Sequence, residues 1–299
     1  MKPVDFELHR PRTVAEALEL LAKYGEEGKV LAGGQSLVPL LNFRLSRPEH
    51  LIDLGRIAAL RTLHRSADSL VIGAMVTHAE AERSRAVAEV APLVAAALPH
   101  IAHQPIRTRG TIGGSAAHGD PAAELPAVLT ALDATMVAAS MRGTRLIPAA
   151  EFFLANLVTE LGDDELLTEI RLTPAGAGTG AAFEEVGRRR GDFALAGAGA
   201  QVTLDGDARI TEARIALTGV SPRPHRAVGA EQVLHGRRPT DDLLEDVAAA
   251  VRGSVQPSDD LHATAEYRRD IAGTLAARAV AGALARAVND PHNTLEAAR

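Results

Sequence analysis

The feature that most constrains this sequence is a pair of adjacent glycines that occurs twice. Gly33-Gly34 follows the apolar run Val30–Ala32, and Gly113-Gly114 lies within the segment Thr111–Ser115. Residues without a Cβ atom let backbone N–H groups approach an anion closely, and a helix that begins there points its positive end at the same place. A tight turn would explain either loop alone, but two such loops favour a binding site for a diphosphate.

The segments around the first loop predict an α/β unit. Thr13 can cap a helix, with Glu16 completing a capping box, and Ser36 can cap a second helix after the glycines. This order puts the first loop at the carboxyl end of a strand, where such folds bind ligands. The predicted elements are helix Thr13–Tyr24, strand Val30–Ala32, helix Leu37–Asn42 and strand His50–Leu54.

The rest of the chain mixes helices and antiparallel strands. The small residues and proline of 174–180 indicate a connection between two domains. Predicted strands are Leu70–Ala74, Thr135–Ala139, Arg145–Ile147, Leu166–Leu172, Ala194–Leu204 and Ala213–Gly219. Predicted helices are Ala79–Arg83, Ala91–His103, Ala123–Leu132, Thr240–Gly253 and Tyr267–Ala287.

Composition excludes several classes of function. The chain has no cysteine, so it can form no disulfide, thiolate-ligated iron–sulfur cluster or cysteine zinc site. Its net charge of −6 and its 3% of aromatic residues disfavour nucleic-acid binding. The N-terminus lacks the apolar run of a signal peptide, and the most apolar segment, 86–102, contains Glu89, Pro92 and Pro99. We therefore expect a cytoplasmic protein without a membrane span.

Other motifs do not point to a site. Gly197-Ala198-Gly199 lacks the third glycine of a Rossmann fingerprint, and Gly28-Lys29 lacks the remaining residues of a P-loop. His100 and His103 have no carboxylates beside them at helical spacing, so we predict no metal site. No Ser/His/Asp arrangement supports hydrolysis, and we predict no catalytic residue in this chain.

The candidate binding residues surround the two loops. Asp120 and Glu124, downstream of the second loop, could accept hydrogen bonds from a ribose. For Asp120, a role in capping the start of a helix is an equally good interpretation. The loop candidates are Leu31, Ala32, Gly33, Gly34, Gln35, Ser36, Leu37, Arg109, Gly110, Thr111, Ile112, Gly113, Gly114 and Ser115.

Together, these motifs resemble the FAD-binding medium subunits of the molybdenum hydroxylases, a family that includes carbon monoxide dehydrogenase and xanthine dehydrogenase-type enzymes. The resemblance covers nearly the whole chain, and the two loops in this order are its most specific part. The matching segments are Ala32–Ser36, Asn42–Leu45, Pro48–Asp53, Ile106–Gly110, Thr111–Ser115, Gly187–Leu195 and Ala265–Arg269.

The resemblance implies an α+β chain. A two-subdomain FAD-binding fold of the vanillyl-alcohol-oxidase (PCMH) type would occupy residues 1–175, with subdomains at about 1–55 and 56–175. A smaller α+β domain, an antiparallel sheet with helices, would occupy residues 181–288. Both loops would hold the diphosphate of FAD.

The resemblance also implies roles for individual residues. Glu124 stands where the family usually has aspartate, and Leu166 or Leu167 would lie near the flavin ring. Phe193 is a candidate for contact with the isoalloxazine ring, with a core aromatic as an equally weighted alternative. Gln35 replaces the histidine of many relatives, and the chain has no cysteine, so FAD should be bound non-covalently.

The implied function is an electron relay. FAD would pass electrons from a [2Fe-2S] cluster on a small partner subunit to an external acceptor, while a large partner subunit carries the molybdenum cofactor. A dimer of heterotrimers is the expected assembly. The alternatives are a stand-alone FAD-dependent oxidoreductase with its own substrate pocket, or a scaffold that has lost its flavin.

Overall fold

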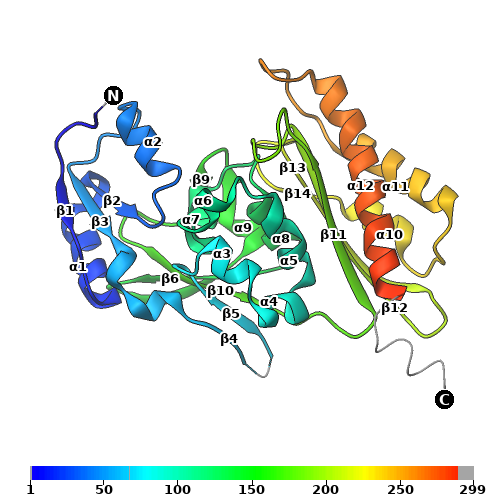
Figure 1. Cartoon of the computed structure of the whole chain (residues 1–299), viewed down its shortest axis with the longest axis horizontal. Helices are drawn as coiled ribbons and strands as arrows, with labels where there is room; N and C mark the ends of the chain where they lie inside the picture. Colours follow the sequence, from blue (N-terminus) through cyan, green and yellow to red (C-terminus); the bar gives the residue numbers. More distant parts are fainter. Residues whose placement is uncertain (1, 67, 289–299) are drawn as a thin grey trace.

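The computed structural model describes residues 2–66 and 68–288, which form three regions along the long axis of the molecule (Figure 1). Each region is centred on a cluster of buried apolar side chains. The fold is α+β, as predicted, and the first two regions meet at the glycine loops.

The N-terminal region is a small parallel sheet with strand order β1-β3-β2. Helix α1 packs its buried Ala17, Leu18 and Leu21 against the apolar side of this sheet. The elements are β1 (Glu7–His9), α1 (Val14–Tyr24), η1 (Gly25–Glu27), β2 (Gly28–Leu31), α2 (Leu37–Asn42), β3 (His50–Asp53) and η2 (Leu54–Arg56).

The middle region is an antiparallel sheet of order β4-β5-β10-β6-β7 covered by short helices. The strands are β4 (Leu63–Arg65), β5 (Leu70–Gly73), β6 (Thr135–Ser140), β7 (Gly143–Pro148) and β10 (Leu166–Leu172), with a separate hairpin of β8 (Phe153–Ala155) and β9 (Val158–Thr159). The helices are η3 (Ala58–Arg61), α3 (His78–Glu82), α4 (Arg85–Val90), α5 (Pro92–Ala97), η4 (Leu98–His100), α6 (Gln104–Arg107), α7 (Ile112–His118), α8 (Glu124–Ala131) and α9 (Ala149–Phe152).

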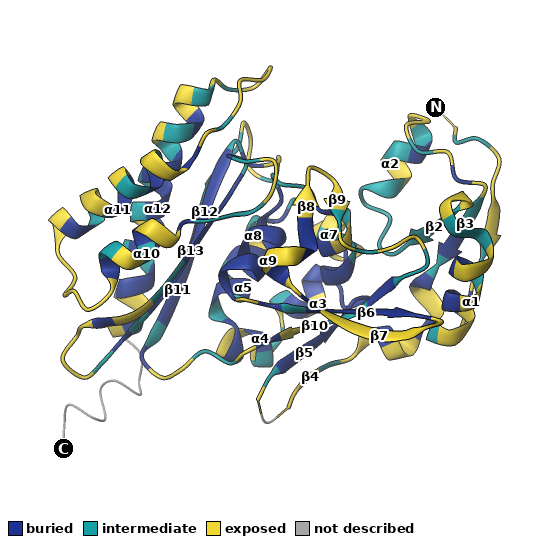
Figure 2. Cartoon of the chain, turned by 180° about the vertical axis from the view of Figure 1, so that it is seen from behind, coloured by how far each residue is buried: buried dark blue, intermediate teal, exposed yellow. Residues whose placement is uncertain are grey.

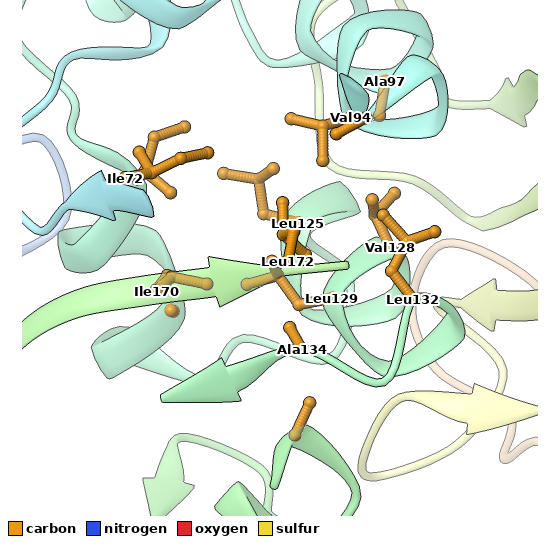
Figure 3. Packing of buried hydrophobic residues seen from close by; sticks show 14 of the residues in the cluster. Ile72, Val94, Ala97, Leu125, Val128, Leu129, Leu132, Ala134, Ile170 and Leu172 are labelled. Carbon is orange, nitrogen blue, oxygen red and sulfur yellow. The ribbon is translucent and has the colours of Figure 1, made fainter. Parts of the chain in front are cut away.

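Branched side chains fill the core of this middle region. Figure 3 shows Leu125 and Leu129 of α8 facing Ile170 and Leu172 of β10, with Val94 of α5 above them. All five side chains are almost fully buried. The core fixes α8, and with it the segment that joins α7 to α8.

The C-terminal region is an antiparallel sheet of order β11-β12-β13-β14 with helices on both faces. Helix α12 covers one face, and α5 and α8 of the middle region cover the other (Figure 1). The elements are β11 (Thr179–Val186), β12 (Ala196–Leu204), β13 (Ile210–Thr218), β14 (His225–Arg226), α10 (Val228–Leu234), α11 (Asp241–Ser254) and α12 (Ala265–Val288).

Helix α12 lies very close to this sheet because small residues line the contact. A Cβ atom at Gly180 would lie 2.1 Å from the carbonyl oxygen of Ala283, so only glycine fits there. Within the described residues, α12 is the one helix long and apolar enough to cross a membrane by length and composition. Half of its apolar window is buried inside the protein, and Figure 2 shows its sheet-facing side buried. It is accordingly a core helix of this region.

Several local predictions were wrong. The helix predicted over Ala91–His103 is divided into α5 and η4, because Pro99 lacks the N–H group that would continue it. The capping box at Thr13 is incomplete, since the Glu16 carboxylate accepts from the N–H of Arg12 instead. The Ser36 side chain makes no capping hydrogen bond to α2. Strands β1, β4, β8, β9, β11 and β14 were not predicted, and β11 begins inside the segment assigned to the connection.

Arg268 provides a test of the C-terminal region. This buried side chain donates to the carbonyl oxygens of Leu195 and Gly219 and pairs with Asp260 at 2.6 Å. We expect Arg268→Met to lower the free energy of unfolding by about 2–4 kcal/mol, because two carbonyl oxygens and a carboxylate lose their donor. Denaturant unfolding should show this loss, whereas the exposed Arg278→Met on the same helix should change stability little. Equal effects of the two substitutions would refute the argument.

Candidate functional site

The two glycine loops touch each other through their backbones. A Cβ atom at Gly33 would lie 2.1 Å from the carbonyl oxygen of Arg109 and 2.8 Å from the Cα of Gly110. A Cβ atom at Gly114 would lie 3.3 Å from the Cβ of Ala32. Segments about eighty residues apart in the sequence therefore form one continuous surface, and no side chain fits at Gly33.

The first loop presents unpaired backbone donors. Gly34 has a φ of +74°, a conformation that favours glycine, and the Gln35 side chain donates to the carbonyl oxygen of Gly33 at 2.8 Å. Among the described residues, the N–H groups of Gly34, Gln35 and Ser36 donate to no acceptor. Leu31 and Leu37, at the ends of β2 and α2, are half-buried on either side. The loop can therefore bind an anion through its amides.

The second loop is built differently from the prediction. The N–H groups of residues 112–115 all donate to protein acceptors, so the expectation of free amides was wrong for these four residues. Their acceptors are, in order, the carbonyl oxygens of Val76 and Ala74, the hydroxyl of Thr111 and the carbonyl oxygen of Thr111. Among the described residues, only the N–H of Thr111 in this loop donates to no acceptor. A Cβ atom at Gly113 would lie 2.4 Å from that of Ala74. Gly113 thus permits close packing of α7 on the end of β5, and the Ser115 hydroxyl lies within the first turn of α7.

A buried histidine, which no sequence signal indicated, supports the second loop. His78 is 5% exposed, and its ring nitrogens have no hydrogen-bond partner of normal geometry among the described residues. A Cβ atom at Gly110 would lie 3.0 Å from its Nδ1, so the ring packs directly against that glycine. Burial lowers the pKa of His78 to about 4, and the imidazole is neutral at pH 7.

Asp120 and Glu124 occupy different environments. The Asp120 carboxylate accepts from the N–H of Ala122 at 2.8 Å and closes a turn ahead of α8. The N-cap of α8 is Ala123, so the interpretation that Asp120 caps a helix was wrong. Glu124 is the first residue of α8 and is 6% exposed. Burial raises its pKa to about 7, and the nearby charge of Glu185 adds to the rise. Glu124 can therefore donate as well as accept a hydrogen bond near neutral pH.

His100 and Glu185 join the middle and C-terminal regions beside Glu124. His100 of η4 lies 3.4 Å from the Glu185 carboxylate of β11, and this contact raises the pKa of His100. The second oxygen of Glu185 is buried without a hydrogen-bond partner among the described residues. Sequence reasoning placed neither residue in the site, because their proximity arises only from tertiary packing.

The remaining candidates are distributed over the site and its surroundings. Leu166 and Leu167 of β10 are each 3% exposed and belong to the cores of the N-terminal and middle regions, respectively. Arg109 is exposed on the second loop. Phe193 is 61% exposed in the connection between β11 and β12, so the alternative that it is a core aromatic was wrong.

Comparison with known families covers nearly the whole chain. Residues 4–174 match the family described as the FAD binding domain in molybdopterin dehydrogenase. Residues 181–283 match the CO dehydrogenase flavoprotein C-terminal domain. The fold and the paired loops therefore define a two-part FAD-binding flavoprotein. The chain belongs to the family of FAD-binding medium subunits of molybdenum-containing hydroxylases, as its sequence motifs indicated.

Relatives and solved structures agree with this family. The chain is 42% identical over 292 residues to the 6-hydroxypseudooxynicotine dehydrogenase complex subunit alpha of Paenarthrobacter nicotinovorans, covering 96% of this chain and 97% of that one. It is 39% identical to the carbon monoxide dehydrogenase medium chain of Hydrogenophaga pseudoflava, and the match covers 96% of this chain and 99% of that one. A structure of carbon monoxide dehydrogenase from that organism superimposes with a TM-score of 0.92 at 40% identity, covering 96% and 99%.

The Glu124 environment generates a prediction about pH. Its folded pKa of about 7 exceeds the ordinary 4.5, so its contribution to stability is present below pH 4.5 and is lost as the pH rises through 7. Glu124→Gln removes this ionisation. Thermal and denaturant unfolding should show the variant gaining about 2–3 kcal/mol relative to wild type between pH 4.5 and pH 8. The exposed Glu266→Gln should show no such gain, and a pH-independent difference for Glu124→Gln would contradict the assignment.

Proposed function

We propose that the chain binds one FAD non-covalently, with the diphosphate held by the first glycine loop. The main support for this proposal is that the backbone N–H groups of residues 34–36 have no acceptor and lie next to the contact between Gly33 and the second loop. The proposed contacts are Leu31, Ala32, Gly33, Gly34, Gln35, Ser36, Leu37, Arg109, Gly110, Thr111, Ile112, Gly113, Gly114, Ser115, Asp120, Glu124, Leu166, Leu167 and Phe193. Gln35 cannot form the covalent bond that histidine could, and no cysteine is present.

The two loops would make different contributions to FAD binding. The first loop supplies amide donors to the diphosphate, which costs no side-chain entropy because the backbone is already ordered. The second loop supplies a packed wall and the Ser115 hydroxyl, since the amides of residues 112–115 are engaged with the end of β5 and with Thr111. Bound FAD supplies one- and two-electron redox chemistry, and the protein positions it.

The chain would act as an electron relay within a larger complex. Its lack of cysteine requires that any iron–sulfur cluster be ligated elsewhere, and relatives are named as medium chains or as subunits of complexes. We propose a small [2Fe-2S] subunit and a large molybdopterin subunit as partners, in a dimer of heterotrimers in the cytoplasm. We also propose residues 1–175 and 181–288 as domains, with subdomains of the first at about 1–55 and 56–175.

Gly33→Ala tests the proposed site. The added methyl would meet the carbonyl oxygen of Arg109 and push the loops apart. We expect FAD affinity to fall by at least about tenfold, which corresponds to 1.4 kcal/mol. Flavin per chain is measured by absorbance after purification, and affinity by titrating FAD into the stripped protein.

Gly176→Ala is the matched control because nothing lies within 4 Å of a Cβ atom there. It should retain wild-type flavin content. Normal FAD affinity in a folded Gly33→Ala variant would show that the diphosphate lies elsewhere.

The relay role is tested by reconstitution. The purified chain should carry FAD but turn over no substrate until the small and large subunits are added, because this sequence cannot ligate the cluster that would supply electrons. Rapid reduction of its flavin by substrate without partners would favour the stand-alone oxidoreductase. A colourless protein that takes up no added FAD would favour the scaffold.

A further inference from the structure

Two histidines and a glutamate meet on neighbouring strands of the N-terminal sheet. Glu7 and His9 are two residues apart on β1, so their side chains share one face. The parallel register sets Glu7 directly opposite His50 of β3. His9 and His50 are largely buried, with 14% and 16% of their side-chain surface exposed.

The separations between their donor atoms match those of a metal-binding site. His9 Nε2 lies 3.1 Å from His50 Nδ1, and the Glu7 oxygens lie 3.5 Å from His50 Nδ1 and 3.8 Å from His9 Nε2. A tetrahedral Zn²⁺ with ligands at about 2.0–2.1 Å separates its donor atoms by about 3.3 Å. One donor atom from each of the three residues lies within 4.8 Å of the donor atoms of the other two residues. The three side chains are therefore arranged to converge on one ion without a change of backbone.

Surrounding groups hold these ligands in place. The Tyr24 ring, at the end of α1, stacks on His50 with centroids 3.7 Å apart and lies 5.0 Å from the His9 ring. Such packing limits the rotamers of both imidazoles and reduces the entropy lost on binding. Glu27 and Glu49 also place carboxylate oxygens close to His50, which makes the surroundings favourable for a cation.

Although the sequence alone predicted no metal site, we propose that Glu7, His9 and His50 form a binding site for a divalent transition-metal ion, with Zn²⁺ as the best match. Imidazole and carboxylate donors suit this ion, and water would complete a four-coordinate shell.

The metal would stabilise the fold and take no part in flavin chemistry. His50 pairs with Gly28 at the amino end of the parallel strands, whereas the first glycine loop follows Leu31 at their carboxyl end. A four-residue strand separates the two sites by about 10 Å. The ion would tie β1, a three-residue strand near the N-terminus, to β3.

Calorimetry on the full, untagged, chelator-treated chain tests the site. Titration with zinc chloride should give one bound Zn²⁺ per chain, and saturating Zn²⁺ should raise the Tm because it binds the folded state. His9→Ala and His50→Ala should each weaken Zn²⁺ binding by at least about tenfold. Loss of a residue that only supports a metal ligand already weakens binding by about this factor, and loss of a ligand should cost no less. Co²⁺ in place of Zn²⁺ should show the absorption bands of a four-coordinate ion in the wild-type protein.

Two controls make the result specific. His64→Ala removes an exposed imidazole of β4 and should leave Zn²⁺ binding unchanged. Gly33→Ala, which is aimed at FAD, should also retain Zn²⁺ binding, so failure of the flavin site and failure of the metal site are distinguishable. Absence of stoichiometric Zn²⁺ binding by the wild-type chain would overturn the proposal, as would undiminished binding in both folded histidine variants.

Discussion

The contact between the backbone of Gly33 and the carbonyl oxygen of Arg109 is the constraint on which the rest of the site depends. It brings the parallel sheet of the N-terminal region against the helical layer of the middle region without an intervening side chain. The amides of residues 112–115 are already paired with protein acceptors, so this part of the second loop is held in place by the fold itself. The first loop packs against this surface, so its unpaired N–H groups are already ordered before a ligand binds.

The sequence predicted the elements whose local signals agree with their tertiary environment. Helix α1 and strand β10 appear as expected, because amphipathic spacing and apolar runs determine which face is buried. The two loops were recognisable because adjacent glycines, which lose much conformational entropy on folding, are typical of places where backbone or ligand approaches closely. Short strands such as β1 carry too few residues for a pattern, and β11 is rich in small residues that also suit a connection.

The less predictable parts of the site depend on contacts between distant segments. Nothing local to Glu124 shows that burial, with a smaller contribution from Glu185, will raise its pKa, or that His100 will lie beside the Glu185 carboxylate. The paired amides of the second loop depend on the end of β5, about forty residues earlier, and the environment of His78 depends on Gly110. Sequence spacing identifies which residues can bind, whereas their protonation and free donors follow from packing.

The sheet shared between helices of two regions limits how this chain can be divided. Ala181 and Phe183 of β11 and Ala216 of β13 complete the apolar core beneath α5 and α8. A gene ending at residue 175 would encode a fragment in which the apolar sides of α5 and α8 are exposed to solvent. Such a fragment would be prone to self-association. Recombination between relatives would have to exchange α5 and α8 together with β11, because their side chains form one core. We therefore expect these segments to evolve as one unit, although a long stretch of chain connects them.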